Sequence, residues 1–454
     1  RTPRRFKALN LPPKNPYIPN DFELLTETGE IPQLLTQSEG LTAWHFADSR
    51  FGVPKAHIIA TFETTGMNAP EMAAAVQLYL AYVEDQLGAS AYPAREAGLD
   101  FSLQPTNTGF SLVVGGYSDR QLTLLEDILA ALKQPRWELG RFERIQQTMF
   151  RELNNFRREY PFRQVVASLN AMLKGQWTPL QKAQAVDQLS MSELAVLVDR
   201  LTANLQLKVL ISGNHGKKSA ERIVASLSSW TSLKPLQPVQ TVARLGSSAS
   251  NSYRAQIPVD HSDAALMLYL QGRDDSLGER AHMLLIAEML SAPFYTTLRT
   301  EKQLGYVVAA FANNHLRVPG LALLVQSSSV NEQALRDEFV QFLDAYLEQV
   351  EALTEDDLNR YRSSVLSNLQ ETPKNLAQLN RRFMESVNLG YNNFDFRPRL
   401  AEELFRVYLK SFKQAYRAMV DDQVPVLTVE TASPEQKNTA LDLREQGSVY
   451  RYEF

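Results

Sequence analysis

The segment Phe294-Tyr-Thr-Thr-Leu-Arg-Thr-Glu-Lys-Gln-Leu-Gly-Tyr-Val-Val308 joins an apolar helix to a strand. Glycine is common just past the end of a helix, because it adopts the left-handed backbone conformation without a steric penalty. We therefore expect the helix to end at Gly305 and Tyr306 to begin the next strand. Arg299 lies in the last turns of that helix. The segment thus predicts a helix, a turn and a strand that present two hydrogen-bonding side chains on one surface.

The same order of elements occurs twice along the chain, at offsets of roughly 207 to 217 residues. Each copy has a strand, two helices, two further strands and a helix, then a long amphipathic helix, shorter helices and a closing strand. The first strands span 57–62 and 264–270, and the closing strands span 205–212 and 424–430. This pattern predicts an α+β fold of two homologous domains, each an antiparallel-rich sheet with helices packed on one side.

Four segments follow from this repeat. Residues 1–44 are rich in proline and are predicted to form an extended N-terminal arm. Residues 45–244 are predicted to be the first α+β repeat and residues 253–454 the second, joined by a linker of small residues at 245–252. The chain begins with Arg1 rather than Met, which suggests a fragment or a processed product.

Composition excludes several classes of function. The 454 residues are 44% apolar, with a net charge of -4 and a pI near 6.0. A chain with this net charge lacks the excess of basic residues that nucleic-acid binding requires, and its apolar runs are too short to cross a bilayer. We therefore expect neither nucleic acid nor a membrane as a partner. There is no cysteine, which excludes disulfides, a thiolate nucleophile and a cysteine-ligated zinc site. The basic cluster of Arg1, Arg4, Arg5 and Lys7 is expected to be a solvated tail.

Several segments, in order along the chain, resemble signature segments of one protease family. They are 11–22, 97–101, 109–112, 116–121 and 294–308. On these segments the chain resembles the insulysin/pitrilysin zinc metalloendopeptidases, and 299–306 resembles their long single-chain branch. The resemblance implies four homologous domains arranged as two bowls around a chamber in which extended peptides are cleaved. It implies that this chain is the C-terminal bowl, with family domains 3 and 4.

Enzymes of that family hold zinc on an H-x-x-E-H helix in their first half. The histidines at 45, 57, 215, 261, 282 and 315 form neither that motif nor H-E-x-x-H. We therefore expect no metal site in this chain and zinc in a missing or partner half. His57 begins an apolar strand, where a hydrogen-bonded structural histidine is expected. The turn at 213–218 lacks the spacing of a phosphate-binding loop. The serines at 327–329 have no histidine in a recognisable triad motif, and we expect them to be polar turn residues.

Arg299 and Tyr306 are the candidate catalytic residues. A zinc peptidase stabilises an oxyanion, which donors aimed at the developing charge can do, and arginine and tyrosine supply such donors. In the resembling enzymes the matching pair reaches substrate at the zinc site of the other half. The aromatic residue matching Tyr295 lines the pocket just past the scissile bond, which implies a substrate-binding role for Tyr295. From the residues alone, an arginine that caps helix carbonyls and a tyrosine with its ring in the core remain the alternative.

The sequence thus predicts the substrate-gripping, chamber-closing half of a zinc-dependent metalloendopeptidase, inactive alone because it lacks H-x-x-E-H. Its expected partners are an N-terminal zinc-binding half, on the same polypeptide or a separate chain, and peptide substrates. The alternative is a non-catalytic scaffold or peptide-binding subunit of the same fold, against which the pair Arg299 and Tyr306 argues. No motif supports an enzyme of another class. The compartment is open, with the periplasm favoured over the cytoplasm.

Overall fold

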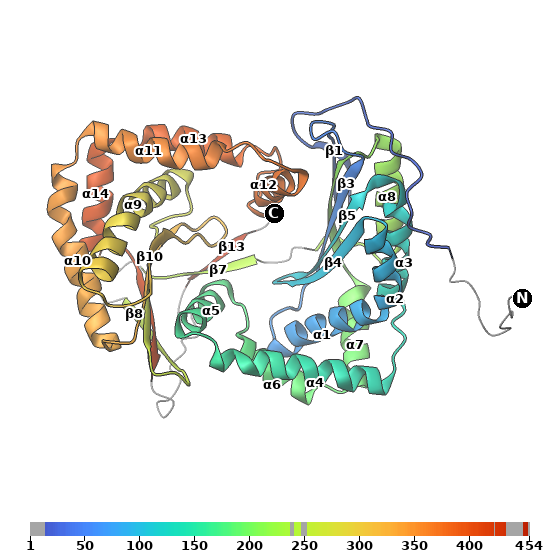
Figure 1. The fold of residues 1–454 in the computed structure, drawn as a ribbon, viewed down its shortest axis with the longest axis horizontal. Coiled ribbons are helices and arrows are strands. Elements are labelled where there is room, and N and C mark those ends of the chain that lie inside the picture. Colours follow the sequence, from blue (N-terminus) through green and yellow to red (C-terminus); the bar gives the residue numbers. More distant parts are fainter. Residues whose placement is uncertain (1–13, 237–239, 247–251, 422, 433–447, 453–454) are drawn as a thin grey trace, which may run out of the picture.

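The computed structural model describes residues 14–236, 240–246, 252–421, 423–432 and 448–452. It contains two lobes side by side, each built on one large sheet, with helices α5 (Pro161–Lys174) and α12 (Leu376–Asn388) between them (Figure 1). The predicted fold class, α+β with two homologous domains, is confirmed. The basic cluster near the N-terminus and most of the predicted linker, 247–251, lie outside the described residues.

The first sheet has the strand order β1-β2-β6-β3-β5-β4. Its strands are β1 (Gln33–Ser38), β2 (Leu41–Ala47), β3 (Lys55–Glu63), β4 (Leu99–Thr106), β5 (Gly109–Tyr117) and β6 (Gln206–Gly213). Besides α5, the helices of this half are α1 (Pro70–Gln86), α2 (Gly88–Glu96), α3 (Gln121–Lys133), α4 (Leu139–Asn155), α6 (Pro179–Gln188), α7 (Met191–Ala203) and α8 (Lys217–Ser229), with short 3-10 turns η1 (Ser118–Arg120) and η2 (Phe156–Arg158).

The second sheet has the strand order β10-β11-β9-β12-β8. Its strands are β8 (Ser252–Pro258), β9 (Ala264–Gln271), β10 (Val307–Ala312), β11 (Gly320–Ser327) and β12 (Val426–Ala432). Besides α12, the helices of this half are α9 (Leu277–Tyr295), α10 (Glu332–Ala352), α11 (Glu355–Gln370), α13 (Phe396–Arg406) and α14 (Leu409–Val420). A separate antiparallel pair joins β7 (Gln240–Arg244) to β13 (Ser448–Tyr452).

The two sheets share one topology over five strands, and the first sheet has β1 as an additional edge strand. In each, the closing strand is parallel to the strand that precedes the predicted first strand, β6 with β2 and β12 with β8, while every other pair is antiparallel. The registers also match, because Leu103 lies opposite Leu112 in the first sheet and Ala310 lies opposite Leu323 in the second. β4 and β10 therefore occupy equivalent edges of the two sheets.

Residues 33–44 are not part of an extended arm, and that prediction was wrong for them. They form β1 and the start of β2, an antiparallel hairpin at the edge of the first sheet. Gly40 makes the tight turn with φ of 72°, and a Cβ there would lie 2.5 Å from the backbone of Lys234. The proline content of the segment before Gln33 obscured this hairpin, although Gly40 between two apolar runs is a hairpin signal.

Each sheet is covered on its second face by a helix from the other half. On the first sheet, α12 contributes Leu376, Leu379, Phe383 and Val387 to a cluster with Trp44, Phe46 and Leu210. On the second sheet, α5 contributes Val165, Leu169, Met172 and Leu173 to a cluster with Ala265, Met267, Tyr269 and Leu427. This exchange was not anticipated from the sequence, although the continuous apolar run of β9 indicates a strand buried on both faces.

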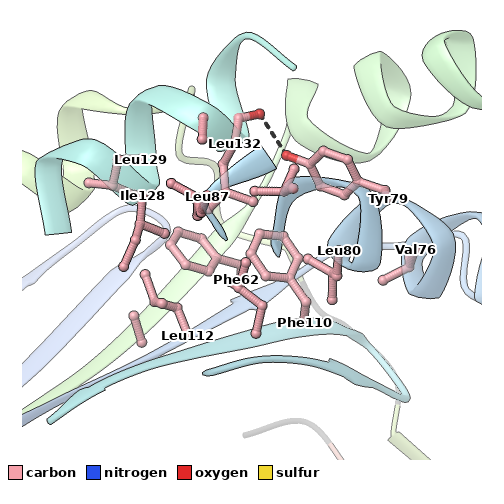
Figure 2. Close-up of a cluster of buried hydrophobic side chains, with 14 of the residues drawn as sticks. Phe62, Val76, Tyr79, Leu80, Leu87, Phe110, Leu112, Ile128, Leu129 and Leu132 are labelled. Atoms are coloured by element: carbon pink, nitrogen blue, oxygen red, sulfur yellow. Dashed lines mark hydrogen bonds between the residues drawn. The ribbon is translucent and has the colours of Figure 1, made fainter. Parts of the chain in front are cut away.

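The helix-covered outer face of the first sheet holds the largest apolar core. Phe62 and Phe110 stack on adjacent strands with ring centroids 4.7 Å apart, beneath α1 and α3 (Figure 2). The Tyr79 hydroxyl donates a hydrogen bond to the Leu132 carbonyl oxygen at 2.6 Å, which satisfies a polar group inside this core (Figure 2). This bond ties α1 to the end of α3.

Phe383→Ala should strongly destabilise the protein, because Phe383 joins the two halves. Its ring lies 4.9 Å from that of Phe46 and 5.4 Å from that of Phe394. Truncating a buried phenylalanine costs about 3 to 5 kcal/mol, measurable as a shift in the urea unfolding midpoint. Phe405→Ala is the matched control, because Phe405 is 61% exposed on α13 and should change stability by less than about 0.5 kcal/mol. Equal losses of stability for the two substitutions would contradict the packing of α12 against the first sheet.

Candidate functional site

Helix α9 does not end as a regular α-helix. It continues into a π-helical turn, η3 (Thr296–Glu301), in which the Lys302 amide donates to the Thr297 carbonyl oxygen at 2.9 Å. Pro293 precedes this turn inside α9 and has no amide hydrogen for the helical ladder. Single π-helical turns inside helices are frequent at functional sites. The regular helix end predicted from the sequence was therefore wrong.

The end of α9 has a buried and an exposed side. Phe294 and Leu298 are fully buried, and the Phe294 ring packs edge to face against Phe339 at 5.3 Å. Tyr295 and Arg299 each follow one of these buried residues and are themselves four apart, so they lie together on the outer side. Burial of the first pair therefore fixes the position of the second pair.

Close packing, rather than backbone conformation, requires Gly305. The residue in the left-handed conformation is Gln303, with φ of 52°, so the prediction of a left-handed Gly305 was wrong. A Cβ at Gly305 would overlap the carbonyl oxygen of Gln326 and would lie 3.3 Å from Cα of Ser327. The glycine therefore lets the chain pass directly against β11 before β10 begins.

The three candidate residues form one cluster. The Arg299 guanidinium lies 5.2 Å from the ring centroid of Tyr295 and 5.7 Å from that of Tyr306. Arg299 Nη1 also donates a hydrogen bond to the Tyr306 carbonyl oxygen. Tyr306 is 85% exposed and Tyr295 is 42% exposed, so neither ring is in the core. Arg299 thus bonds a carbonyl beyond the end of the helix, rather than a helix carbonyl, and the two aromatic rings lie at the surface.

This cluster is suited to hold a polar ligand group. The hydrogen bond and the two rings fix the plane of the guanidinium, which has five N–H donors and uses one of them for Tyr306 O. The phenolic hydroxyl of Tyr306 is a further donor at an exposed position. A carbonyl or carboxylate oxygen that approaches this surface would meet donors on a preorganised support.

Three histidines, one half-buried and two buried, pack within the structure. His57 Nδ1 lies 3.0 Å from Asn380 Nδ2 on α12, which ties the two halves together, and burial lowers the pKa of His57. His215 bonds the side chains of Gln121 at 2.8 Å and Ser219 at 3.0 Å, so the turn at 213–218 is a structural turn. His315 is fully buried against the Tyr269 ring, and neither of its nitrogens has a hydrogen-bond partner among the described residues.

Metal-ligating side chains do not gather anywhere in the described part of the chain. No group of three or more histidine, cysteine, aspartate or glutamate side chains within it could hold a metal ion. Over the same residues, no helix is long and apolar enough to cross a membrane.

Two family models match the chain. Residues 1–185 match the model described as the middle or third domain of peptidase_M16. Residues 285–384 match the model described as PQQ synthase PqqF-like, C-terminal lobe domain 4, which includes the α9–β10 segment. The first match covers the predicted arm and most of the first repeat, and the second match lies within the second repeat.

Curated relatives match most of the chain. The chain is 28% identical to the insulin-degrading enzyme of Homo sapiens over 398 residues, which is 85% of this chain and 39% of that protein. It is 23% identical to the A-factor-processing enzyme of Saccharomyces cerevisiae over 421 residues, covering 88% of this chain and 40% of that protein. The chain therefore spans less than half the length of these relatives.

Solved structures show the same fold. Pitrilysin superposes with a TM-score of 0.88 at 19% identity, over 98% of this chain and 49% of that chain. A peptidase M16 inactive domain from Pseudomonas fluorescens superposes with a TM-score of 0.64 at 15% identity, over 90% of this chain and 99% of that chain.

Gly305→Ala should destabilise the protein and displace the start of β10, because the new Cβ would overlap the Gln326 carbonyl oxygen. A loss of about 1 to 3 kcal/mol is expected from such overpacking, measured by urea unfolding. Gly140→Ala is the matched control, since no atom lies within 4 Å of the place a Cβ would take and the residue lies in the first turn of α4. That control should be neutral or stabilising. Equal stability of the two variants would show that Gly305 is not sterically constrained.

Acid should destabilise the protein, because buried neutral histidines gain protons on unfolding. Burial lowers the pKa of His215 to about 4 and that of His315 to about 3, both from an ordinary value of 6.5. Below pH 6.5 the unfolded state therefore binds more protons, and stability falls as the pH decreases from 6.5 toward 4. Each histidine is expected to cost about 2 kcal/mol at pH 5 relative to pH 8, measured by urea unfolding at both values.

His315→Leu separates this effect from other acid effects. The substitution removes one titrating ring from an apolar site, so the stability loss between pH 8 and pH 5 should shrink by about 2 kcal/mol. A pH-dependent loss equal to that of the unsubstituted protein would show that His315 is not protonated on unfolding in this range.

Proposed function

Since the chain belongs to the M16 peptidase family and corresponds to its C-terminal half, we propose that it is the substrate-gripping, chamber-closing half of a zinc-dependent metalloendopeptidase. The observation that supports this most strongly is the exposed cluster of Tyr295, Arg299 and Tyr306. These three residues carry polar donors and aromatic surface on a rigid helix end, where a substrate can reach them.

Arg299 and Tyr306 would hold the carbonyl oxygen of the scissile peptide bond. A carbonyl that gains negative charge during hydrolysis binds more tightly to donors that are already in place, so these donors lower the barrier. Because Arg299 is fixed by its bond to Tyr306 O, little side-chain freedom is lost when substrate binds. Tyr295 would contact the neighbouring substrate side chain through its exposed ring.

The zinc of this reaction would be held by the other half. The described residues contain no group of metal-ligating side chains, and the sequence has no H-x-x-E-H motif, so the present residues do not fit a zinc site. An exposed cluster cannot exclude water by itself. The N-terminal half would therefore supply the metal and close over Arg299 and Tyr306 to form the chamber.

The alternative is a non-catalytic scaffold or peptide-binding subunit of the same fold. A neighbour described as an inactive domain shows that the fold occurs without activity of its own. A scaffold would have no use for a guanidinium held between two exposed aromatic rings, whereas a site for peptide carbonyls uses it directly. We therefore favour the half-enzyme.

Tyr306→Phe tests this proposal in the complete enzyme with both halves. The substitution removes one hydroxyl at an 85% exposed position, so folding should be unchanged. If the hydroxyl holds the carbonyl in the transition state, kcat and kcat/KM should fall together by about 10² or more. Arg299→Lys should also lower both, because an ammonium group cannot replace the planar fork.

Tyr92→Phe is the matched control, because Tyr92 is 65% exposed on α2, far from the cluster in sequence, and should retain full activity. Thermal unfolding of all variants shows whether any loss is structural. Full activity of Tyr306→Phe on several peptides would remove the catalytic role of the hydroxyl.

A further inference from the structure

The two equivalent sheet edges differ in protection. The first edge, β4, carries Asp100 and Pro105, and charges and prolines on edge strands oppose pairing with another strand. The second edge, β10, reads Val-Val-Ala-Ala-Phe-Ala and has neither. The protein therefore blocks one of its two equivalent edges and leaves the other suited to strand pairing.

A carboxylate also covers the backbone of the first edge. Glu84 on α1 accepts a hydrogen bond from the Leu103 amide on β4 at 3.1 Å. The counterpart of Leu103 is Ala310. The Asn313 amide donates to the Gly320 carbonyl oxygen across the ladder, and amide directions alternate along a strand, so the Ala310 amide points away from β11. At the offset of 207 residues that separates the first residues of the two helices, Pro70 and Leu277, Glu84 corresponds to Ser291, which is exposed and too short to replace a carboxylate.

A cavity of about 360 Å³ lies beside the open edge. It exists where the second repeat has smaller side chains, because Ser291 stands in place of Glu84 and Ala287 in place of Leu80. Its remaining walls are mostly apolar and come from β10 and α11, with Ala310, Phe311, Val365 and Leu369 among them. The cavity therefore opens directly onto the β10 backbone.

The charged groups of this cavity already have partners. Glu288 Oε1 accepts a hydrogen bond from the Ser364 hydroxyl at 2.6 Å. Arg397 donates to Glu385 Oε2 at 2.8 and 3.0 Å and to the Leu369 carbonyl oxygen at 3.0 Å. Because both charged side chains are already paired and most of the other lining residues are apolar, the cavity favours an apolar side chain.

We propose that β10 binds an extended peptide as an added strand, with one apolar side chain of the peptide in the cavity beside Ser291. The peptide would accept the Ala310 amide hydrogen, as Glu84 accepts that of Leu103 in the first repeat. The inference rests on the proposed function for its occupant, a peptide substrate. Tyr306 lies four residues before Ala310, about 13 Å along a strand, so one extended peptide reaches both places.

Ser291→Glu tests the proposal by giving the second edge the carboxylate of the first. The probe is a fluorescein-labelled peptide of about nine residues, threonine and alanine with one central leucine, a length that suits one added strand. It is titrated against the 454-residue chain by fluorescence anisotropy. Ser291→Glu should weaken binding about tenfold or more, and Ala287→Leu, which fills the cavity as Leu80 does, should act similarly. Ser291→Ala is the matched control and should bind as the unsubstituted chain does.

Hydrogen exchange locates the bound peptide. The amides of residues 307–312 should exchange more slowly when the peptide is present. The same peptide with alternate backbone amides N-methylated should bind at least about tenfold more weakly, because it cannot complete a ladder. This control does not depend on the folding of any variant. Unchanged affinity of both cavity variants, or exchange at 307–312 that the peptide does not slow, would overturn the proposal.

A second copy of the chain is the competing occupant of an open edge. Sedimentation that shows a dimer abolished by Ser291→Glu, with no peptide binding, would assign β10 to self-association and reject the peptide. The anisotropy assay needs no zinc-binding half and no turnover. The peptide-binding assay therefore tests strand addition at β10 independently of the Tyr306→Phe experiment. Full activity of Tyr306→Phe would count against the catalytic role of the hydroxyl but would leave strand addition at β10 intact.

Discussion

Each large sheet of this protein has two apolar faces, and the need to bury both determines its architecture. One half alone covers only one face of its sheet, so α12 of the second half covers the first sheet and α5 of the first half covers the second. His57 and Asn380 add a polar contact at the same junction, at 3.0 Å. The two repeats therefore depend on each other for burial. Their relative position, which sets where the surface cluster lies, is fixed by these exchanged helices.

Much of the fold was accessible from the sequence, because strand and helix periods, together with glycine positions, recur in the same order in both halves. The hairpin of β1 and β2 was missed because prolines dominate the segment before it, so composition outweighed the signal of Gly40. The exchange of α5 and α12 was missed for a different reason. Amphipathic patterns show that a helix has an apolar face, but they do not show which sheet that face covers.

The candidate site was predictable in its residues but not in its geometry. Spacing alone places Tyr295 and Arg299 on one helix face, and the structure brings Tyr306 to the same cluster. The π-helical turn and the left-handed Gln303 carry no clear sequence signal. The role of Gly305 likewise depends on a residue distant in sequence, Gln326, whose carbonyl oxygen occupies the space of a side chain.

Differences between the repeats are more informative about function than their similarities. Glu84 and Leu80 close the edge of the first repeat, while Ser291 and Ala287 leave the edge of the second open. The same second repeat carries the exposed cluster at the start of β10, directly before the open edge. Closing an edge lowers the risk of unwanted pairing, so an edge left open next to preorganised donors needs a functional explanation. A peptide that uses both features provides one, since backbone pairing supplies affinity without sequence preference and the cavity adds selectivity for one side chain.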